Sequence, residues 1–226
     1  YAQIRDVRRE IESRKLNLVC FTPEQCVYPV NLASDNEDTR RRSRKFFENS
    51  IRAAGELGCK KVLVTSGTGY FDESNREDAW KWAADGLYAL GEMAADYGTV
   101  LALEVLRRDE SNLVHDLPGL MKMLRQLDHP SIGGMIDTSP MALAGERPAQ
   151  YLESLGDKLV HIHFIDGAPR GHLAWGDGVL DMEGYLAELD AYPYKGYLSL
   201  EITDGRYFTD PSSSVEKSIK RLWSVL

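Results

Sequence analysis

Cysteine is scarce in this sequence. Its 226 residues include three cysteines, Cys20, Cys26 and Cys59, and no two of them form a CxxC pair. An odd number of scattered cysteines argues against the disulfide framework that small secreted domains use. We therefore expect a reducing, cytoplasmic setting.

Long apolar runs are absent as well. A membrane-spanning helix requires about 18 or more consecutive apolar residues, and nothing in the sequence approaches that length or looks like a signal peptide. We predict no membrane partner. The chain begins at Tyr1 rather than methionine, so we expect that its natural N-terminus is not included.

Positive charge is in deficit. The 27 Lys and Arg residues face 35 Asp and Glu residues, which gives a net charge of -8 and a pI of about 5.2. A large phosphate-binding surface, and with it a nucleic-acid partner, is therefore not expected. The basic run over residues 40–45 (RRRSRK) is the exception. Acidic residues flank it in a helical stretch, so we interpret it as a solvated helix face.

What the sequence does contain is a regular alternation of strand-like and helix-like segments. Gly58 is the predicted C-cap of a helix over residues 39–58, and a serine is the predicted N-cap of the last helix, over residues 212–226. Residues 139–156 are predicted to form a loop and one helix. Six apolar segments are predicted as strands: 16–22, 61–67, 99–105, 131–138, 158–166 and 196–203. Alternating βα units imply an α/β protein with a parallel sheet.

Two observations favour a barrel over an open doubly wound sheet. Candidate functional side chains lie at the ends of four different strands, as barrels allow. No glycine-rich dinucleotide fingerprint follows the first strand. We predict a (β/α)8 TIM barrel that forms one domain over residues 1–226. A closed barrel needs eight strands, so we expect about two N-terminal βα units to be absent from this chain.

Four of the predicted strands end on a side chain that can bind a metal ion: Glu104 in VLALEVL, Asp137 in IGGMIDT, His163 in VHIHFID and Glu201 in YLSLEIT. The gaps between them are 33, 26 and 38 residues, about the length of a βα unit, which predicts that all four meet at one end of the barrel. Three carboxylates and one imidazole suit a divalent cation. Mn²⁺ is the first expectation, with Co²⁺, Mg²⁺ and Zn²⁺ as alternatives.

Each of these residues also has a purely structural interpretation. The two glutamates lie in apolar strands, where a charge is costly unless it is paired or bound to a metal. Glu104 could form a buried salt bridge with Arg107 or Arg108, and Asp137 could cap the following helix. A single strand histidine such as His163 is more often structural than a ligand.

Further polar residues are expected around the cluster. His161 and His163 lie at i and i+2 and so face the same side of their strand. His163 is nearer the C-terminal end and is the predicted ligand, whereas His161 lies deeper in the pocket, where it would orient a neighbour. The loop after this strand carries Arg170 and His172. The residues expected to contact substrate are His161, Glu110, Arg170, Glu24 and Tyr28.

The segments that carry these residues resemble a known family. FTPEQCVYPVN, LEVLRRDESNLV, MIDTSPMALAGE, LGDKLVHIHFID and GYLSLEITDGRY are similar to segments of the xylose-isomerase-like TIM-barrel superfamily of sugar isomerases and epimerases, in the same order. The similarity is greatest to the ketose 3-epimerase branch, and within it to fructoselysine-type enzymes. It covers nearly the whole chain from about Leu16. Each motif is short, so the specificity lies in order and spacing.

The resemblance implies roles for individual residues. It makes Glu104, Asp137, His163 and Glu201 the metal ligands. Glu104 and Glu201 would also be the acid–base pair, and Glu110 a contact to the substrate or to a ligand. Pro140 is a departure, because free-ketose epimerases have a substrate-binding histidine at that position; a modified sugar fits better. Arg170 lies near the position of an arginine that follows the histidine ligand in free-ketose enzymes.

Together these expectations describe a divalent-metal-dependent isomerase of a ketose or ketosamine. It would remove the proton beside the ketone through an enediolate, and the expected reaction is C3 epimerisation of a fructoselysine-like substrate. A sugar-phosphate isomerase or an inosose-dehydratase-type lyase is an alternative, and a non-catalytic sugar-binding barrel is an alternative of another class. The expected partner is a small sugar, and a homo-oligomer stays open.

Overall fold

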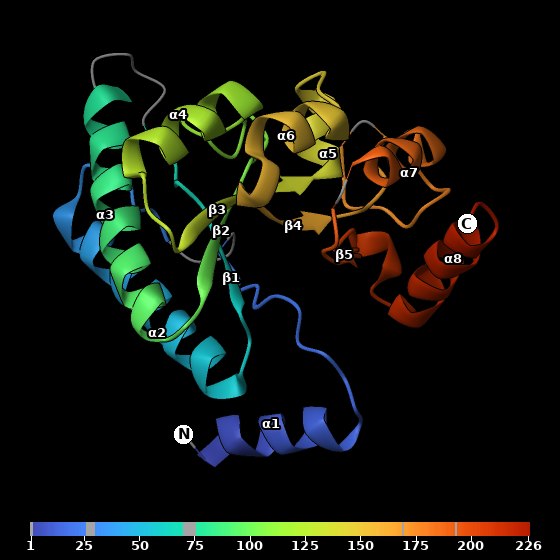
Figure 1. Ribbon diagram of the computed structural model, residues 1–226, viewed down its shortest axis with the longest axis horizontal. Helices are drawn as coiled ribbons and strands as arrows, with labels where there is room; N and C mark the ends of the chain where they lie inside the picture. The colour runs from blue at the N-terminus through green and yellow to red at the C-terminus, as the bar shows by residue number, and fades with distance from the viewer. Residues whose placement is uncertain (1, 26–29, 70–75, 169, 193) are drawn as a thin grey trace. The chain divides into compact units, whose positions relative to one another are not determined.

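The computed structural model describes residues 2–25, 30–69, 76–168, 170–192 and 194–226 (Figure 1). The chain divides into two compact units, Tyr1–Gly134 and Met135–Leu226, here called unit 1 and unit 2. Strand β3 (Ile132–Asp137) crosses the boundary between them. In both units helices alternate with parallel strands, which confirms the predicted α/β class.

Unit 1 is built around two paired strands and long helices. Strand β1 (Lys61–Val64) pairs in parallel with β2 (Val100–Glu104), with Lys61 opposite Val100 and Val64 opposite Leu103. The start of β3 follows β2 in the sheet of this unit. The helices are α1 (Ala2–Ser13), α2 (Glu37–Leu57), α3 (Arg76–Asp96) and α4 (Leu117–Leu127). Helices α2 and α3 pack against each other beside the strands (Figure 1).

Local sequence sets the limits of α2. The Asn36 side chain accepts a hydrogen bond from the Thr39 amide, which satisfies one of the open N–H groups at the helix start. Gly58 ends the helix in the left-handed conformation, with φ 81°, so the predicted C-cap is confirmed. Between these ends Phe47, Ile51 and Ala54 lie on one buried face.

The predicted strand over residues 16–22 is the clearest difference in unit 1. Within it Phe21 forms an isolated parallel bridge with Val62, through Phe21 N–H to Lys61 O at 2.9 Å and Leu63 N–H to Phe21 O at 3.0 Å. Pairing with β1 at a single residue does not make a strand, and Leu16 is 60% exposed. The apolar pattern there was therefore misleading about how far the chain pairs.

Unit 2 contains the end of β3, then β4 (Leu159–His163) and the short strand β5 (Leu198–Ser199). Strands β4 and β5 are parallel, with His163 opposite Ser199. The helices are α5 (Thr138–Leu143), α6 (Pro148–Leu155), α7 (Met182–Ala191) and α8 (Pro211–Trp223), with 3-10 turns at Gly156–Lys158 and Gly205–Tyr207.

Three details of unit 2 differ from the sequence predictions. Residues 139–156 form parts of two helices, α5 and α6, separated by Gly145 in a left-handed conformation. The cap of α8 is Asp210, which accepts from the Ser213 amide, rather than a serine. Strand β5 ends at Ser199, so Glu201 lies two residues beyond it. No helix among the described residues is long and apolar enough to cross a membrane.

Candidate metal centre

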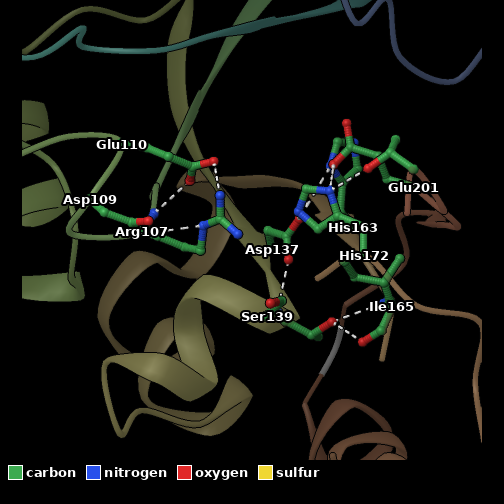
Figure 2. Close-up of polar contacts among 11 residues, drawn as sticks. Arg107, Asp109, Glu110, Asp137, Ser139, His163, Ile165, His172 and Glu201 are labelled. Carbon is green, nitrogen blue, oxygen red and sulfur yellow. Dashed lines mark hydrogen bonds and ion pairs between the residues drawn. The ribbon is translucent and has the colours of Figure 1, made fainter. Parts of the chain in front are cut away.

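Three predicted ligands come together in unit 2. Asp137 is the last residue of β3, His163 is the last residue of β4, and Glu201 follows β5. Parallel strands present their C-terminal ends at one edge of a sheet, so these side chains converge (Figure 2). One ligand atom from each lies within 4.8 Å of the others. Burial is nearly complete for Asp137 and His163, whereas the Glu201 side chain is 24% exposed.

The distances between these atoms suit ligands of a single ion. His163 Nδ1 lies 3.0 Å from Glu201 Oε2 and 3.9 Å from Asp137 Oδ2. Metal bonds of about 2.1 Å separate neighbouring ligand atoms by about 3 Å and opposite ones by about 4 Å. Oxygen and imidazole nitrogen donors also match the preferences of Mn²⁺, Co²⁺ and Zn²⁺. The residues present therefore fit a divalent cation.

Asp137 serves two purposes that the sequence offered as alternatives. Its Oδ1 accepts a hydrogen bond from the Ser139 amide at 2.8 Å, so it caps helix α5. Its Oδ2 faces His163. Because the helix start fixes one carboxylate oxygen, the other is presented to the cluster in a defined orientation.

The surroundings of Glu201 favour its ionised form. Burial by itself raises the pKa of the Glu201 carboxyl, but the hydrogen bond and charge of His163 lower it. The charge of His172 and a hydrogen bond with Asp137 lower it further, and the net pKa lies below its ordinary value. Two imidazoles beside one carboxylate thus outweigh desolvation, and Glu201 is a carboxylate at neutral pH.

His161 lies behind His163, as the strand periodicity predicted. The two rings pack edge to face with centroids 5.4 Å apart. His161 is 0% exposed, and its Nε2 lies 3.0 Å from Ser199 Oγ on β5. From this position His161 can hold the ring of His163 in place. A direct contact of His161 with substrate stays a prediction.

His172, one of the further polar residues expected around the cluster, reaches it. His172 lies on the loop after β4, with Nε2 3.5 Å from Asp137 Oδ2 and Nδ1 3.9 Å from Glu201 Oε2 (Figure 2). Arg170, the predicted substrate contact two residues earlier, is exposed. The sequence placed both residues on this loop, but nothing in a loop sequence tells which side chain turns inward.

Unit 1 carries the remaining predicted residues. Glu104 is the last residue of β2 and is buried. Glu110 is held by Arg107, whose Nη2 lies 2.6 Å from Oε1 and whose amide donates to Oε2 at 3.1 Å (Figure 2). Glu24 is exposed. Tyr28 lies outside the described residues. The roles of these four residues stay predictions.

The Cys20 thiol is protonated at neutral pH, chiefly because it is buried, and the charge of Glu104 contributes to this. Burial, and next the neighbouring Cys59, raises the pKa of the Cys20 thiol to about 12. A thiol with so high a pKa stays protonated at neutral pH, whereas metal ligation requires the thiolate. Carboxylate and imidazole remain the donors to consider.

Comparison with known proteins agrees with the fold. The xylose isomerase-like TIM barrel family matches residues 2–224. Fructoselysine 3-epimerase of Shigella flexneri is 26% identical over 226 residues, which cover 99% of this chain and 81% of the relative.

Two solved structures show the same fold. A 3-keto-D-glucoside 4-epimerase from E. coli has a TM-score of 0.83 at 23% identity, covering 99% of this chain and 85% of that one. A D-psicose 3-epimerase from Clostridium cellulolyticum H10 has a TM-score of 0.80 at 17% identity, covering 98% and 81%. The predicted barrel fold is thereby confirmed, and the relatives are enzymes of the sugar epimerase type.

Proposed function

Because the chain belongs to the xylose isomerase-like TIM barrel family, we propose that it is a divalent-metal-dependent epimerase of a ketose or ketosamine. The observation that carries the proposal is the convergence of Asp137, His163 and Glu201 at the C-terminal ends of neighbouring parallel strands. This is the end at which barrel enzymes place their chemistry.

We assign the metal to Asp137, His163 and Glu201 together with Glu104 from the end of β2. A divalent cation held there would polarise the ketone oxygen and stabilise negative charge that develops on it. Mn²⁺ is the metal we expect first. The buried carboxylate of Glu104 and the ionised carboxylate of Glu201 are then available for proton transfer.

The reaction needs one proton removed and one returned. One carboxylate takes the proton from the carbon beside the ketone, which leaves the substrate as an enediolate. The other carboxyl group delivers a proton to the opposite face of the same carbon, which gives the epimer. We assign Glu104 and Glu201 to these steps, and the two exchange roles when the direction reverses. No oxidant or further reactant is consumed.

The substrate we propose is a fructoselysine-like ketosamine, epimerised at C3. Two features support this choice: the 26% identity with fructoselysine 3-epimerase in an alignment that covers 99% of this chain, and Pro140 at the position where enzymes of free ketoses are expected to have a histidine. Glu110, clamped by Arg107, and Arg170 are the residues we assign to the sugar's hydroxyls. Both offer charged groups that can form strong hydrogen bonds.

Exchange of substrate C–H for deuterium in heavy water tests the proposal. Metal-stripped protein would be supplied with Mn²⁺ and offered fructoselysine, fructose or tagatose, with NMR locating the exchanged carbon. We expect Mn²⁺-dependent exchange at C3 of fructoselysine, lost in Glu201→Gln. Glu183→Gln is the matched control, because Glu183 is 63% exposed and pairs with Arg221 away from the cluster.

Other outcomes identify the alternatives. Exchange at C1 or C2, or activity with a phosphorylated sugar, would indicate an isomerase of a different substrate. Loss of water from an inosose would indicate a lyase. Metal and sugar binding without exchange in the folded protein would indicate a sugar-binding barrel and overturn the enzymatic proposal.

A further inference from the structure

The described residues between β4 and α7 (164–168 and 170–181, here the β4–α7 loop) are organised around one buried carboxylate. Asp166 is 2% exposed, and its two oxygens accept hydrogen bonds from four backbone amides of the loop: Gly167 at 2.8 Å, Gly176 at 3.0 Å, Gly178 at 2.8 Å and Leu180 at 3.0 Å. At Gly178 a Cβ would collide with Asp166 Oδ1, so glycine lets the backbone approach the carboxylate closely there. These four hydrogen bonds to one carboxylate hold the backbone of the loop in a defined conformation.

Other contacts hold the same loop against the rest of unit 2. Asp166 and Leu173 exchange both of their backbone hydrogen bonds, at 2.9 and 3.0 Å. The indole N–H of Trp175, which is 1% exposed, donates to Phe164 O at 3.0 Å. Tyr207 accepts from the Ala174 amide and donates to Asp177. His172 directly precedes Leu173, so this framework fixes the position of its backbone.

The side chain of His172 is fixed as well. Its Nδ1 lies 2.8 Å from the hydroxyl of Thr203, and its Nε2 points at Asp137 Oδ2. When Nδ1 accepts a hydrogen bond from the hydroxyl, Nε2 carries the ring proton and directs it toward a carboxylate oxygen. The reverse tautomer would turn a nitrogen lone pair toward that oxygen. When the Thr203 hydroxyl donates to Nδ1, His172 therefore presents Nε2–H toward Asp137 Oδ2, 3.5 Å away.

We propose that His172 is a positioning residue that holds the metal-facing oxygen of Asp137, with Thr203 and the Asp166-centred loop holding His172. The Ser139 amide holds Oδ1 of Asp137, and the ring of His172 lies beside Oδ2, with Nε2 3.5 Å away. A carboxylate fixed in this way binds a cation without first losing rotational freedom. The inference rests on the proposed metal site and adds a residue to it.

Titration of the metal-stripped protein with Mn²⁺ alone, by calorimetry, tests this without any substrate. We expect His172→Ala to weaken Mn²⁺ binding about 10–100-fold, because loss of a partner that orients a ligand has effects of this size. Thr203→Val, which keeps the shape but removes the hydroxyl, should weaken binding in the same direction by less. Val179→Ala is the control, since Val179 is on the same loop and 76% exposed.

Two conservative variants separate positioning from simple loss of packing. The amide nitrogen of Gln reaches about as far as Nε2 of histidine, so His172→Gln should restore part of the affinity. The amide nitrogen of Asn reaches only as far as Nδ1, so His172→Asn should not restore the affinity. Equal losses in His172→Gln, His172→Asn and His172→Ala would overturn the role of the Nε2–H contact.

The outcomes also separate this inference from the proposed function. Wild-type affinity in both His172→Ala and Thr203→Val overturns the positioning role and leaves the epimerase proposal standing. Absence of Mn²⁺, Co²⁺ and Zn²⁺ binding by the wild type overturns both. If His172→Ala does not fold, as judged by circular dichroism, Thr203→Val with unchanged affinity is enough to reject the inference.

Discussion

Apart from Glu104 at the end of β2, unit 1 buries mainly apolar side chains along two long helices, whereas unit 2 buries several acids and imidazoles at or just after the ends of its strands. Helices α2 and α3 each have 21 residues and line a core that includes Phe47, Ile51 and Leu87. In unit 2 the described buried groups include Asp137, His161, His163 and Asp166, and helices α6 and α7 have 8 and 10 residues.

The difference has an energetic meaning. Burying an apolar side chain contributes to stability directly, at about 1.5–3 kcal/mol for a large one. A buried charge costs free energy unless partners satisfy it. Asp166 accepts hydrogen bonds from four amides, and Asp137 accepts one from the Ser139 amide with imidazoles beside its other oxygen. We therefore expect changes in the helical core of unit 1 to act mainly on stability, and changes at Glu104 or in the cluster of unit 2 to act mainly on metal binding and chemistry.

The largest effect is expected from Glu201→Gln. At saturating Mn²⁺ the rate of deuterium exchange at C3 should fall by about 10³-fold or more, because the amide cannot transfer the proton. The measurement is the exchange rate by NMR, with melting temperature as the control for folding. A variant that keeps a tenth of the activity would remove Glu201 from the acid–base pair.

Phe47→Ala is the counterpart in unit 1. Phe47 is 0% exposed, with its ring 5.5 Å from that of Phe46, so its removal leaves a cavity. The free energy of unfolding should fall by about 3–5 kcal/mol, measured by urea denaturation. The Mn²⁺ affinity of the folded fraction should not change. A parallel loss of affinity would break the proposed separation between stability and site.

Two substitutions at Asp137 separate its two purposes. Asp137→Asn keeps an oxygen for the Ser139 amide but loses the charge, so Mn²⁺ affinity should fall about 100-fold with little change in the melting temperature of the metal-free protein. Asp137→Ala should lose the same affinity and also about 1 kcal/mol of stability, because helix α5 loses its cap. Equal melting temperatures for the two variants would contradict the capping role.

Gly58→Ala tests a purely local feature of unit 1. A Cβ at this position meets no heavy atom within 4 Å, so the cost is that of the left-handed backbone alone. We expect a loss of about 1 kcal/mol in unfolding free energy and unchanged Mn²⁺ affinity. A much larger loss would indicate that the end of α2 has a role beyond its cap.

The smallest effect is expected at the Lys217–Asp177 pair beside the β4–α7 loop. The hydrogen bond from Lys217, and then that from Tyr207, lowers the pKa of the Asp177 carboxyl. A lowered folded-state pKa gives stability that is present above the unfolded value of about 3.9 and is lost as pH falls through the folded value.

Lys217→Met should therefore lower the melting temperature at pH 6 slightly and have no effect at pH 2. Lys217 is 47% exposed, so the loss should stay below about 1 kcal/mol. Melting curves between pH 2 and pH 7 measure this, with Lys220→Met as the control on the same helix. A loss that is independent of pH would show that packing rather than charge is involved.

Much of this arrangement could be predicted from residue order. The strands that end at Glu104, Asp137 and His163 were located because each is a short apolar run that stops at one polar residue. The strand predicted over residues 16–22 and the extent of β5 were wrong, because pairing depends on a neighbouring strand and not on the segment itself.

His172 and Asp166 show where sequence patterns stop being informative. Their sequence context, an acid and a histidine in a glycine-rich loop, is compatible with many loop shapes. Only hydrogen bonds to residues far along the chain, such as that between His172 and Thr203, decide which side chains turn toward the cluster.

The sequence by itself determined the α/β class, the order of the elements, and which acids and histidine stand at strand ends, because the period of apolar residues and the helix caps are local properties. The tertiary structure alone decided that Asp137 turns one oxygen to the Ser139 amide and that His172 lies beside the other. Those contacts join residues up to 35 positions apart, from Asp137 to His172, and depend on how the folded chain brings strand ends and a loop together.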